Sequence, residues 1–275
     1  MLSADQFNDF HDWGYCRLPS AFDPELAREL GSRLLQFLDR ELSVRLDDPS
    51  TWRDLRGGAH FTRLVRTGVF KPVATARLAE AIDDLLGPGN WADPRGWGSP
   101  LVTLPANANS DAAWDVPSSG WHTDFPCWPP APTLRMFAYL SDVQPEGAGT
   151  LVVAGSHRMA ASWAERNPEA SRNSGDFKKS LGRCNPWFAE LFSREPSPQS
   201  RTARFMDETT EAFGVSVRVV ELSANAGDVV LWHPSLLHAE APNALRDPRL
   251  MATHTVQASW PKTAVSEPRP RIDTV

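Results

Sequence analysis

From Trp91 onward, short apolar runs alternate with clusters of Pro, Gly, Asn and Ser. Short runs rich in Val, Leu, Phe and Trp predict strands, and helical patterns are rare between them, which disfavours βαβ units. We therefore expect a mainly β fold with flanking helices, either a sandwich or a jelly-roll barrel. The expected strands cover residues 101–104, 120–124, 134–140, 150–153, 216–222, 228–232 and 250–259.

The N-terminal part carries helix signals instead. Ser3 and Gln6 form a capping-box pattern, and Asp23-Pro24 is a typical helix start. We expect residues 1–90 to be mostly helical and to pack on the β region. The expected elements are a helix from Ser3 to about residue 12, a strand over 15–18, a helix beginning at 24 and a helix over 73–86.

Residues 158–215 lack a strand pattern. This segment is polar, rich in Arg and interrupted by Pro196 and Pro198, with one helix expected near 186–193. A stretch of this length within a compact domain is typical of an insertion or a lid. We expect residues 1–275 to form a single domain that contains this insertion within the jelly roll.

The composition excludes several classes of protein. The chain has 28 Lys and Arg against 34 Asp and Glu, a formal net charge of −6, which disfavours nucleic-acid and membrane-surface partners. No stretch of 18 apolar residues predicts a transmembrane helix. The three cysteines form no C-x-x-C pair, which favours a reducing compartment. We expect a cytoplasmic monomer or homodimer with a small-molecule substrate.

One candidate metal motif is His122-x-Asp124, because residues i and i+2 of a strand project from the same face. The motif alone is weak, since a buried His–Asp hydrogen bond explains most such pairs. A second segment, from Gly227-Asp228 to His238, offers a third ligand. Two imidazoles and one carboxylate on one octahedral face leave three coordination positions open and suit Fe(II). Periodicity alone does not decide between His233 and His238.

Several motifs together resemble the phytanoyl-CoA dioxygenase (PhyH) family of Fe(II)/2-oxoglutarate-dependent oxygenases. The resemblance covers roughly residues 101–260. It rests on His122-x-Asp124, Gly149-Thr150-Leu151 leading to Gly155-Ser156-His157, Gly227-Asp228 leading to His238, and Pro242-Asn243 with Arg249.

This resemblance implies a double-stranded β-helix, a cupin-like jelly roll, that uses Fe(II), 2-oxoglutarate and O₂. It favours His238 over His233 and implies that His122, Asp124 and His238 bind the iron. Arg249 is then the anchor of the 2-oxoglutarate C5 carboxylate, a role that the planar guanidinium suits. The implied reaction abstracts hydrogen from a substrate C–H bond, most simply for hydroxylation; desaturation, epimerisation and cyclisation begin in the same way.

The chain also departs from the family pattern. Glu240 stands where members often have a small hydroxyl residue, and Met251 stands where related oxygenases have Ser. Thr103, Thr253 or Thr255 could supply the missing contact to the cosubstrate. Asp124 is present, whereas related halogenases replace this carboxylate by a small residue, so halogenation is disfavoured.

Other residues near these motifs are open to two interpretations. Arg135 is either a surface charge, which we favour, or a contact to a substrate carboxylate. We expect His157 to bond backbone, and His254 to lie on the strand face opposite Arg249. The third case is a group of tryptophans that either packs in the core or forms an aromatic wall for a substrate: Trp91, Trp97, Trp114, Trp121 and Trp128.

No basic pocket for a CoA phosphate is evident, so we expect a free metabolite such as an amino acid or a natural-product intermediate. Two alternatives remain at this point. A zinc-dependent hydrolase or cupin-type isomerase would use the same three ligands with a metal-bound water. A non-catalytic jelly-roll binding module would use the cavity alone. Neither alternative gives Arg249 a role.

Overall fold

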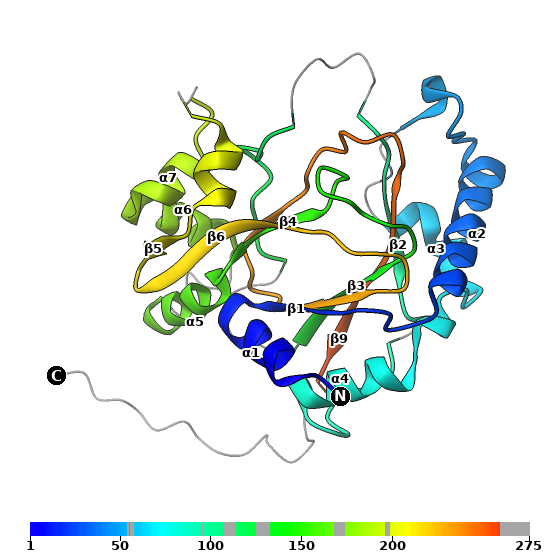
Figure 1. The fold of residues 1–275 in the computed structure, drawn as a ribbon, viewed down its shortest axis with the longest axis horizontal. Coiled ribbons are helices and arrows are strands. Elements are labelled where there is room, and N and C mark those ends of the chain that lie inside the picture. Colours follow the sequence, from blue (N-terminus) through cyan, green and yellow to red (C-terminus); the bar gives the residue numbers. More distant parts are fainter. Residues whose placement is uncertain are drawn as a thin grey trace.

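The computed structural model describes residues 1–53, 55, 58–94, 96–106, 114–124, 133–167, 174–195 and 199–258. Its centre is two sheets in which every strand pairing is antiparallel (Figure 1). One sheet has the order β1-β7-β3-β9-β2 and the other β5-β6-β4-β8. The strands are β1 (Tyr15–Leu18), β2 (Ser99–Thr103), β3 (Thr133–Tyr139), β4 (Thr150–Ala154), β5 (Thr210–Ala212), β6 (Val215–Leu222), β7 (Val229–Trp232), β8 (His238–Ala239) and β9 (Arg249–Gln257).

The expected strands are present within a few residues, with one exception. The strand expected over 120–124 is wrong, because His122 forms only an isolated bridge to His238. Gly120 has a φ of +84°, a left-handed conformation that interrupts an extended chain. Two short strands, β5 and β8, were not expected. The expected end of the last strand at residue 259 lies outside the described residues.

The space between the two sheets is filled by inward-facing side chains. They alternate along the strands with outward-facing ones, as the two-residue period of a strand requires. Members of this interior cluster include Phe137, Tyr139, Val152, Trp232 and Met251. Each of the long strands β3 and β9 therefore presents one face to this interior and the other to a helical layer.

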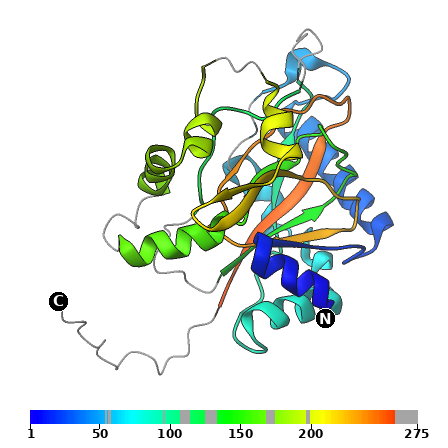
Figure 2. The same ribbon diagram turned by 60° about the vertical axis from the view of Figure 1, so that its left-hand side comes forward.

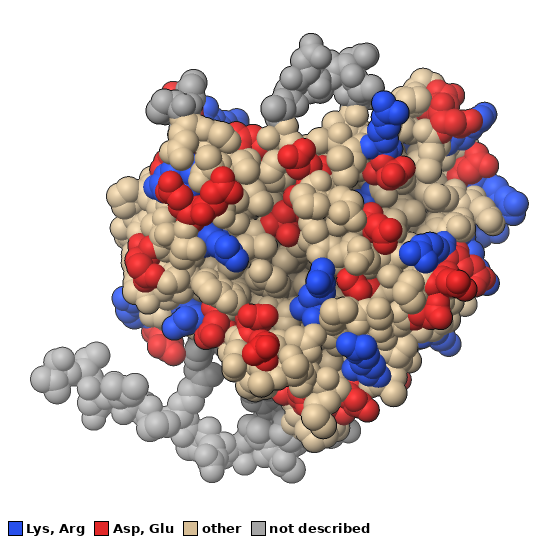
Figure 3. All heavy atoms as spheres, in the orientation of Figure 1, with Lys and Arg blue, Asp and Glu red and all other residues tan. Residues whose placement is uncertain are grey.

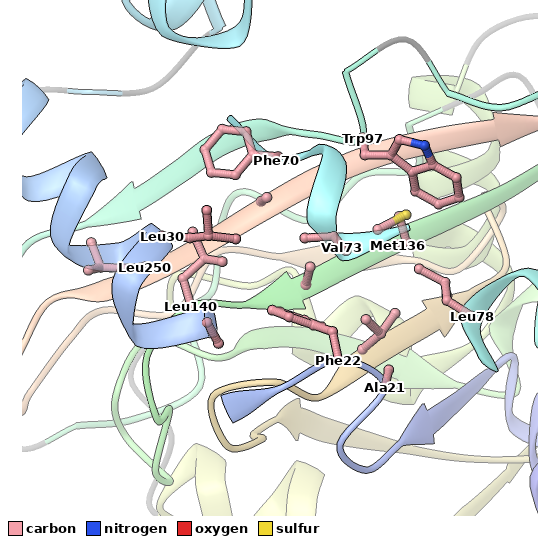
Figure 4. Packing of buried hydrophobic residues seen from close by; sticks show 14 of the residues in the cluster. Ala21, Phe22, Leu30, Phe70, Val73, Leu78, Trp97, Met136, Leu140 and Leu250 are labelled. Carbon is pink, nitrogen blue, oxygen red and sulfur yellow. The ribbon is translucent and has the colours of Figure 1, made fainter. Parts of the chain in front are cut away.

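The N-terminal helices cover the outer face of the five-stranded sheet. Figure 4 shows Leu30, Val73 and Leu78 packed near Met136 and Leu250 of that sheet. This confirms the helical character expected of the first 90 residues. The helices are α1 (Ala4–Trp13), which has the predicted capping box, α2 (Pro24–Leu42), α3 (Thr62–Arg66) and α4 (Ala76–Leu86). The last begins three residues later than expected, because Thr75 caps it and residues 71–73 form a separate 3₁₀ turn.

A second helical layer covers the outer face of the four-stranded sheet (Figure 2). It consists of α5 (Ser156–Arg166), α6 (Ser174–Cys184) and α7 (Pro186–Leu191). Their apolar side chains pack with Leu151 and Val153 of β4. Only α7 was expected from the sequence. Helices α5 and α6 have polar and basic faces, which masked their narrow apolar stripes in the sequence. The action of residues 158–215 as a lid stays a prediction.

Among the described residues, no helix combines the length and the apolar character that crossing a membrane requires.

Candidate metal centre

Three side chains from two separate parts of the sequence converge at one end of the interior. Nε2 of His122 lies 3.6 Å from Oδ1 of Asp124, and Nε2 of His238 lies 3.5 Å from the same oxygen. Within the described parts of the chain, this is the group of His, Cys, Asp and Glu side chains that could hold a metal ion. His122 is about half exposed, whereas the side chain of His238 is 8% exposed. The group is therefore anchored in the fold and open to solvent on one side.

The backbone fixes both imidazoles. The N–H of His122 donates to the carbonyl of His238, and the N–H of His238 donates to the carbonyl of His122, each at 2.9 Å. Each ring then donates from Nδ1 to a carbonyl two residues earlier, Gly120 at 2.7 Å and Leu236 at 2.9 Å. With Nδ1 protonated, the Nε2 lone pair of each ring is free to bind a cation.

The electrostatics favour a cation between these groups. Burial favours the neutral form of Asp124, but hydrogen bonds from His122 and His238 and the charge of Arg135 hold its pKa far below the ordinary value. The hydrogen bond to Asp124 in turn raises the pKa of His122, against the effect of burial. The carboxylate is thus anionic and draws positive charge toward the two rings, and a divalent cation can replace the proton they would otherwise share.

The glycine and polar motifs around His238 are structural. Gly227 has a φ of +92°, and a Cβ there would lie 2.7 Å from the carbonyl oxygen of Phe22. The carboxylate of Asp228 accepts from the backbone N–H of Ser20 at 2.8 Å and of Asn225 at 3.1 Å. Ser156 Oγ accepts from Leu237 N at 2.8 Å. These hydrogen bonds stabilise the turns that place His238 next to His122 and Asp124.

Arg249 is a buried cation at the start of β9, only 2% exposed. Its Nη1 donates to the carbonyl of Ala148 and, at 3.4 Å, to Thr150 Oγ1, while its Nε has no hydrogen-bond partner. No carboxylate of the described residues lies within ion-pair distance. Burial lowers its pKa to about 10. A buried guanidinium without an anion costs several kcal/mol, so this site is suited to bind one.

The three threonines suggested as cosubstrate contacts lie on the interior face with Arg249. Thr103 is directly opposite Arg249 in the β2–β9 register, and Thr253 and Thr255 follow it along β9 at even spacing. Thr253 Oγ1 is buried without a partner. A cavity of about 230 Å³ reaches this region, lined by Arg53, Leu55, Leu101, Val102, Thr103, Leu104 and Glu240. Glu240, exposed at this mouth, acts on the charge of both His122 and Arg249.

The other histidines do not join the metal group. His233 instead packs against the ring of His157, with centroids 5.2 Å apart. His157 Nε2 bonds the carbonyl of His11 at 3.0 Å, which confirms its structural role. His254 lies five residues after Arg249 on β9, and therefore on the opposite face.

Four of the five tryptophans pack outside the roll. Trp91 and Trp97 contact one another at 6.2 Å beside the N-terminal helices. Trp114 and Trp121 pack with the other helical layer, and Trp128 lies outside the described residues. Packing is therefore the role of the four described tryptophans. The sequence interpretation missed Trp232, whose ring lies 4.8 Å from that of His238. Its place in an inward-facing strand position next to the ligand segment was the available signal.

Arg135 is a further correction. It is not a surface charge: its side chain is 20% exposed and lies on the interior face of β3. Arg135 Nε is 2.8 Å from Asp124 Oδ2, although the N–H does not point at that oxygen in hydrogen-bond geometry. The only observable signal in the sequence was its even spacing from Phe137 and Tyr139.

Comparison with known proteins now decides the family. The family model described as "Phytanoyl-CoA dioxygenase (PhyH)" matches residues 10–251. The chain belongs to the phytanoyl-CoA dioxygenase family. It is therefore an Fe(II)- and 2-oxoglutarate-dependent dioxygenase with the jelly-roll fold of that family. This membership removes the zinc hydrolase and the non-catalytic module, and it does not by itself fix the reaction that the enzyme catalyses. No curated protein sequence matches the chain.

Solved structures agree with this fold. AviO1 from Streptomyces viridochromogenes Tue57 has a TM-score of 0.52 and 16% identity, covering 97% of each chain. The 2-oxoglutarate-dependent carbocyclase SnoK from nogalamycin biosynthesis has a TM-score of 0.51 and 16% identity, over 94% of this chain and 84% of its own. EctD from S. alaskensis, in its apoform, has a TM-score of 0.50 and 19% identity, over 94% and 77%.

Proposed function

We propose that this PhyH-family enzyme oxidises a C–H bond of a small metabolite, most simply by hydroxylation, with His122, Asp124 and His238 as the iron ligands. One observation carries the proposal: two imidazole Nε2 atoms and a carboxylate oxygen lie close together in a roll whose interior also holds the buried Arg249, which forms no ion pair with the described residues. The three ligands fit Fe(II) with open coordination positions, and Arg249 fits the far carboxylate of 2-oxoglutarate.

When bound, Fe(II) and 2-oxoglutarate supply the O₂-dependent oxidation, in which the cosubstrate loses CO₂ and becomes succinate. The residues of the chain provide the geometry. The reciprocal backbone bonds of His122 and His238 keep both Nε2 atoms directed at the ion. Arg249 orients the cosubstrate by its distal end, and the apolar side chains around Trp232 limit water in the interior.

The substrate we propose is a free metabolite, such as an amino acid or a natural-product intermediate, rather than an acyl-CoA. Figure 3 shows acidic and basic side chains interspersed over one face, with no broad basic patch. A CoA thioester carries several phosphate charges and would need such a patch. Cytoplasmic location and a monomeric or homodimeric state belong to the same proposal and rest on composition.

The test is an anaerobic titration of the apo-protein with Fe(II) and then 2-oxoglutarate. We expect a metal-to-ligand charge-transfer band in the green region, and on admission of O₂ we expect succinate. His238→Ala should give no band, whereas His60→Ala, which changes an exposed histidine outside the metal group, should give the wild-type band. A folded wild-type protein without the band would overturn the proposal.

A further inference from the structure

Arg135 occupies the central strand of the five-stranded sheet, beside the metal group. In the register of β3 it lies opposite Trp232 on one side and Thr255 on the other. Its Nη1 donates to Thr255 Oγ1 at 2.7 Å, and its guanidinium carbon lies 5.4 Å from the centre of the Trp232 ring. Three different strands therefore hold this guanidinium in one place on the interior face.

The anionic partner of Arg135 is one that the metal also needs. Asp124 directs Oδ1 to the two imidazoles and Oδ2 to Arg135, at 2.8 Å from Nε. The Asp124 carboxylate is therefore shared between the metal group and Arg135. The Nε–H of Arg135 is buried and meets no acceptor in hydrogen-bond geometry among the described residues.

Two more buried polar atoms near Arg135 have no hydrogen-bond partner among the described residues. Trp232 is fully buried, and its Nε1–H makes no hydrogen bond. Thr253 Oγ1, two positions along β9 from Thr255, is buried and likewise unpaired. A buried donor without an acceptor costs about 1–3 kcal/mol, so such atoms near one another indicate a place for a ligand rich in acceptors. A carboxylate presents two oxygens and a negative charge.

We propose that Arg135, with Trp232 and Thr253 beside it, is a second carboxylate receptor in the roll, and that it selects substrates bearing a carboxylate near the oxidised carbon. This inference rests on the proposed function and names its substrate class. The carboxylate of 2-oxoglutarate that lies nearest the metal could also bind to Arg135. The experiment therefore has one arm for the cosubstrate and one for the substrate.

The first arm measures binding of Mn(II), and then of 2-oxoglutarate to the Mn(II)-loaded protein, by calorimetry. The variants are Arg135→Gln, Arg135→Lys and, as a matched control, Arg17→Gln on the neighbouring part of the sheet. Because Arg135 contacts Asp124, every 2-oxoglutarate titration is made at saturating Mn(II). If the receptor serves the cosubstrate, Arg135→Gln weakens 2-oxoglutarate binding to the Mn(II)-saturated protein at least about tenfold. If it serves the substrate, this binding equals that of wild type.

The second arm titrates the anaerobic Fe(II)·2-oxoglutarate complex with small carboxylic acids, including α-amino acids, and with the matching primary amides. If the receptor serves the substrate, a carboxylic acid shifts the charge-transfer band at a concentration at least about tenfold lower than its amide requires. Arg135→Gln abolishes this preference, and Arg135→Lys, which keeps the charge, restores part of it. If the wild-type complex shows no charge-transfer band, the result contradicts the proposed function and not this inference.

Two results overturn the inference. The first is that the wild-type complex binds no carboxylic acid more tightly than its amide, and that Arg135→Gln leaves the affinity for 2-oxoglutarate unchanged. The other is that Arg135→Gln changes only the affinity for Mn(II), which would make Arg135 a positioning residue for Asp124 alone. Circular dichroism of each variant confirms folding, and Arg135→Lys provides the readout if the Gln variant does not fold.

Discussion

Arg201 donates from its guanidinium Nε to the carbonyl oxygen of Val116 at 2.6 Å. The same side chain bonds the carbonyls of Pro117, Glu190 and Leu191, so it ties the segment that leads to His122 to the end of α7. The carboxylate of Asp115 reinforces the tie by accepting from the backbone N–H of Arg201 and of Thr202. The helical layer on the four-stranded sheet thus helps to place a candidate metal ligand.

Replacing this arginine tests the connection. Arg201→Gln removes four hydrogen bonds to carbonyl groups and should lower the free energy of unfolding by about 2–4 kcal/mol. It should also weaken Mn(II) binding, because the His122 segment is loosened. The matched control is Arg204→Gln, which breaks a partly exposed ion pair with Glu190 and should cost less than about 1 kcal/mol. Equal effects in urea titrations of the two variants would contradict the account.

Arg249→Gln should weaken 2-oxoglutarate binding at least about tenfold without changing Mn(II) affinity, because a charged hydrogen-bond donor to the far carboxylate is lost. The probe 2-oxobutanoate lacks that carboxylate, so wild type and Arg249→Gln should bind it equally. Arg246→Gln, an exposed substitution nearby, is the control. If 2-oxobutanoate binding also falls, Arg249 supports the fold and not the cosubstrate.

His238→Ala should abolish measurable Mn(II) or Co(II) binding in equilibrium dialysis. Loss of an outer hydrogen-bond partner of a metal ligand typically costs about 10–100-fold in affinity, and loss of the ligand itself should cost more. His60→Ala again serves as the exposed-histidine control. Retained binding in His238→Ala would return His233 to consideration.

The buried histidine pair predicts loss of stability in acid. Burial lowers the pKa of His157 to about 4 and that of His233 to about 3. In the unfolded chain both return to about 6.5, so below that pH the unfolded chain binds more protons than the folded one. Stability from these groups is therefore complete above about pH 6.5 and falls as the pH drops toward 4, for His157 by at most about 1.4 kcal/mol per pH unit.

Urea titrations of metal-free protein at pH 7.5 and 5 measure this fall. His157→Gln keeps a side-chain donor for the His11 carbonyl but does not titrate, so its stability should fall less between the two pH values. A pH dependence identical to wild type would assign the acid sensitivity to other groups.

The predicted lid action of residues 158–215 can be measured by hydrogen–deuterium exchange. If the segment closes over the site, Mn(II) with 2-oxoglutarate should slow exchange there more than in α2, which lies in the other helical layer. The packing of Phe177 and Phe188 against β4 restricts any movement to small shifts of these helices. Equal protection of the segment and of α2 would exclude a lid.

The strands and the candidate metal ligands could be predicted from the sequence for different reasons. Strands such as β3 and β9 have apolar runs that strand propensity recognises directly. The pairing of His122 with His238 came from a family resemblance, since nothing local in 120–124 forms a strand. The two histidines are brought together by a bridge between residues 116 positions apart in the sequence. Patterns within a short stretch of sequence cannot predict such a pairing.

Arg135 and the helices α5 and α6 show what sequence could not decide. A lone arginine in an apolar strand is interpreted as exposed, because burying a charge is costly; here Asp124, Thr255 and Trp232 compensate for that cost from distant segments. The helices bury only a narrow stripe against β4, so their overall polarity resembled that of a loop.

Strand β1 pairs with β7 along its whole length, from Tyr15 opposite Trp232 to Leu18 opposite Val229, and it is the last strand on that side of its sheet. Without it, β7 would offer a bare row of backbone donors and acceptors to any other extended chain. Because β1 pairs with β7, the strand that leads to His238 is hydrogen-bonded on both sides, and the open edge of the sheet lies on β1 instead. The N-terminal segment thus keeps the strand before the candidate ligand away from the edge where another chain could pair.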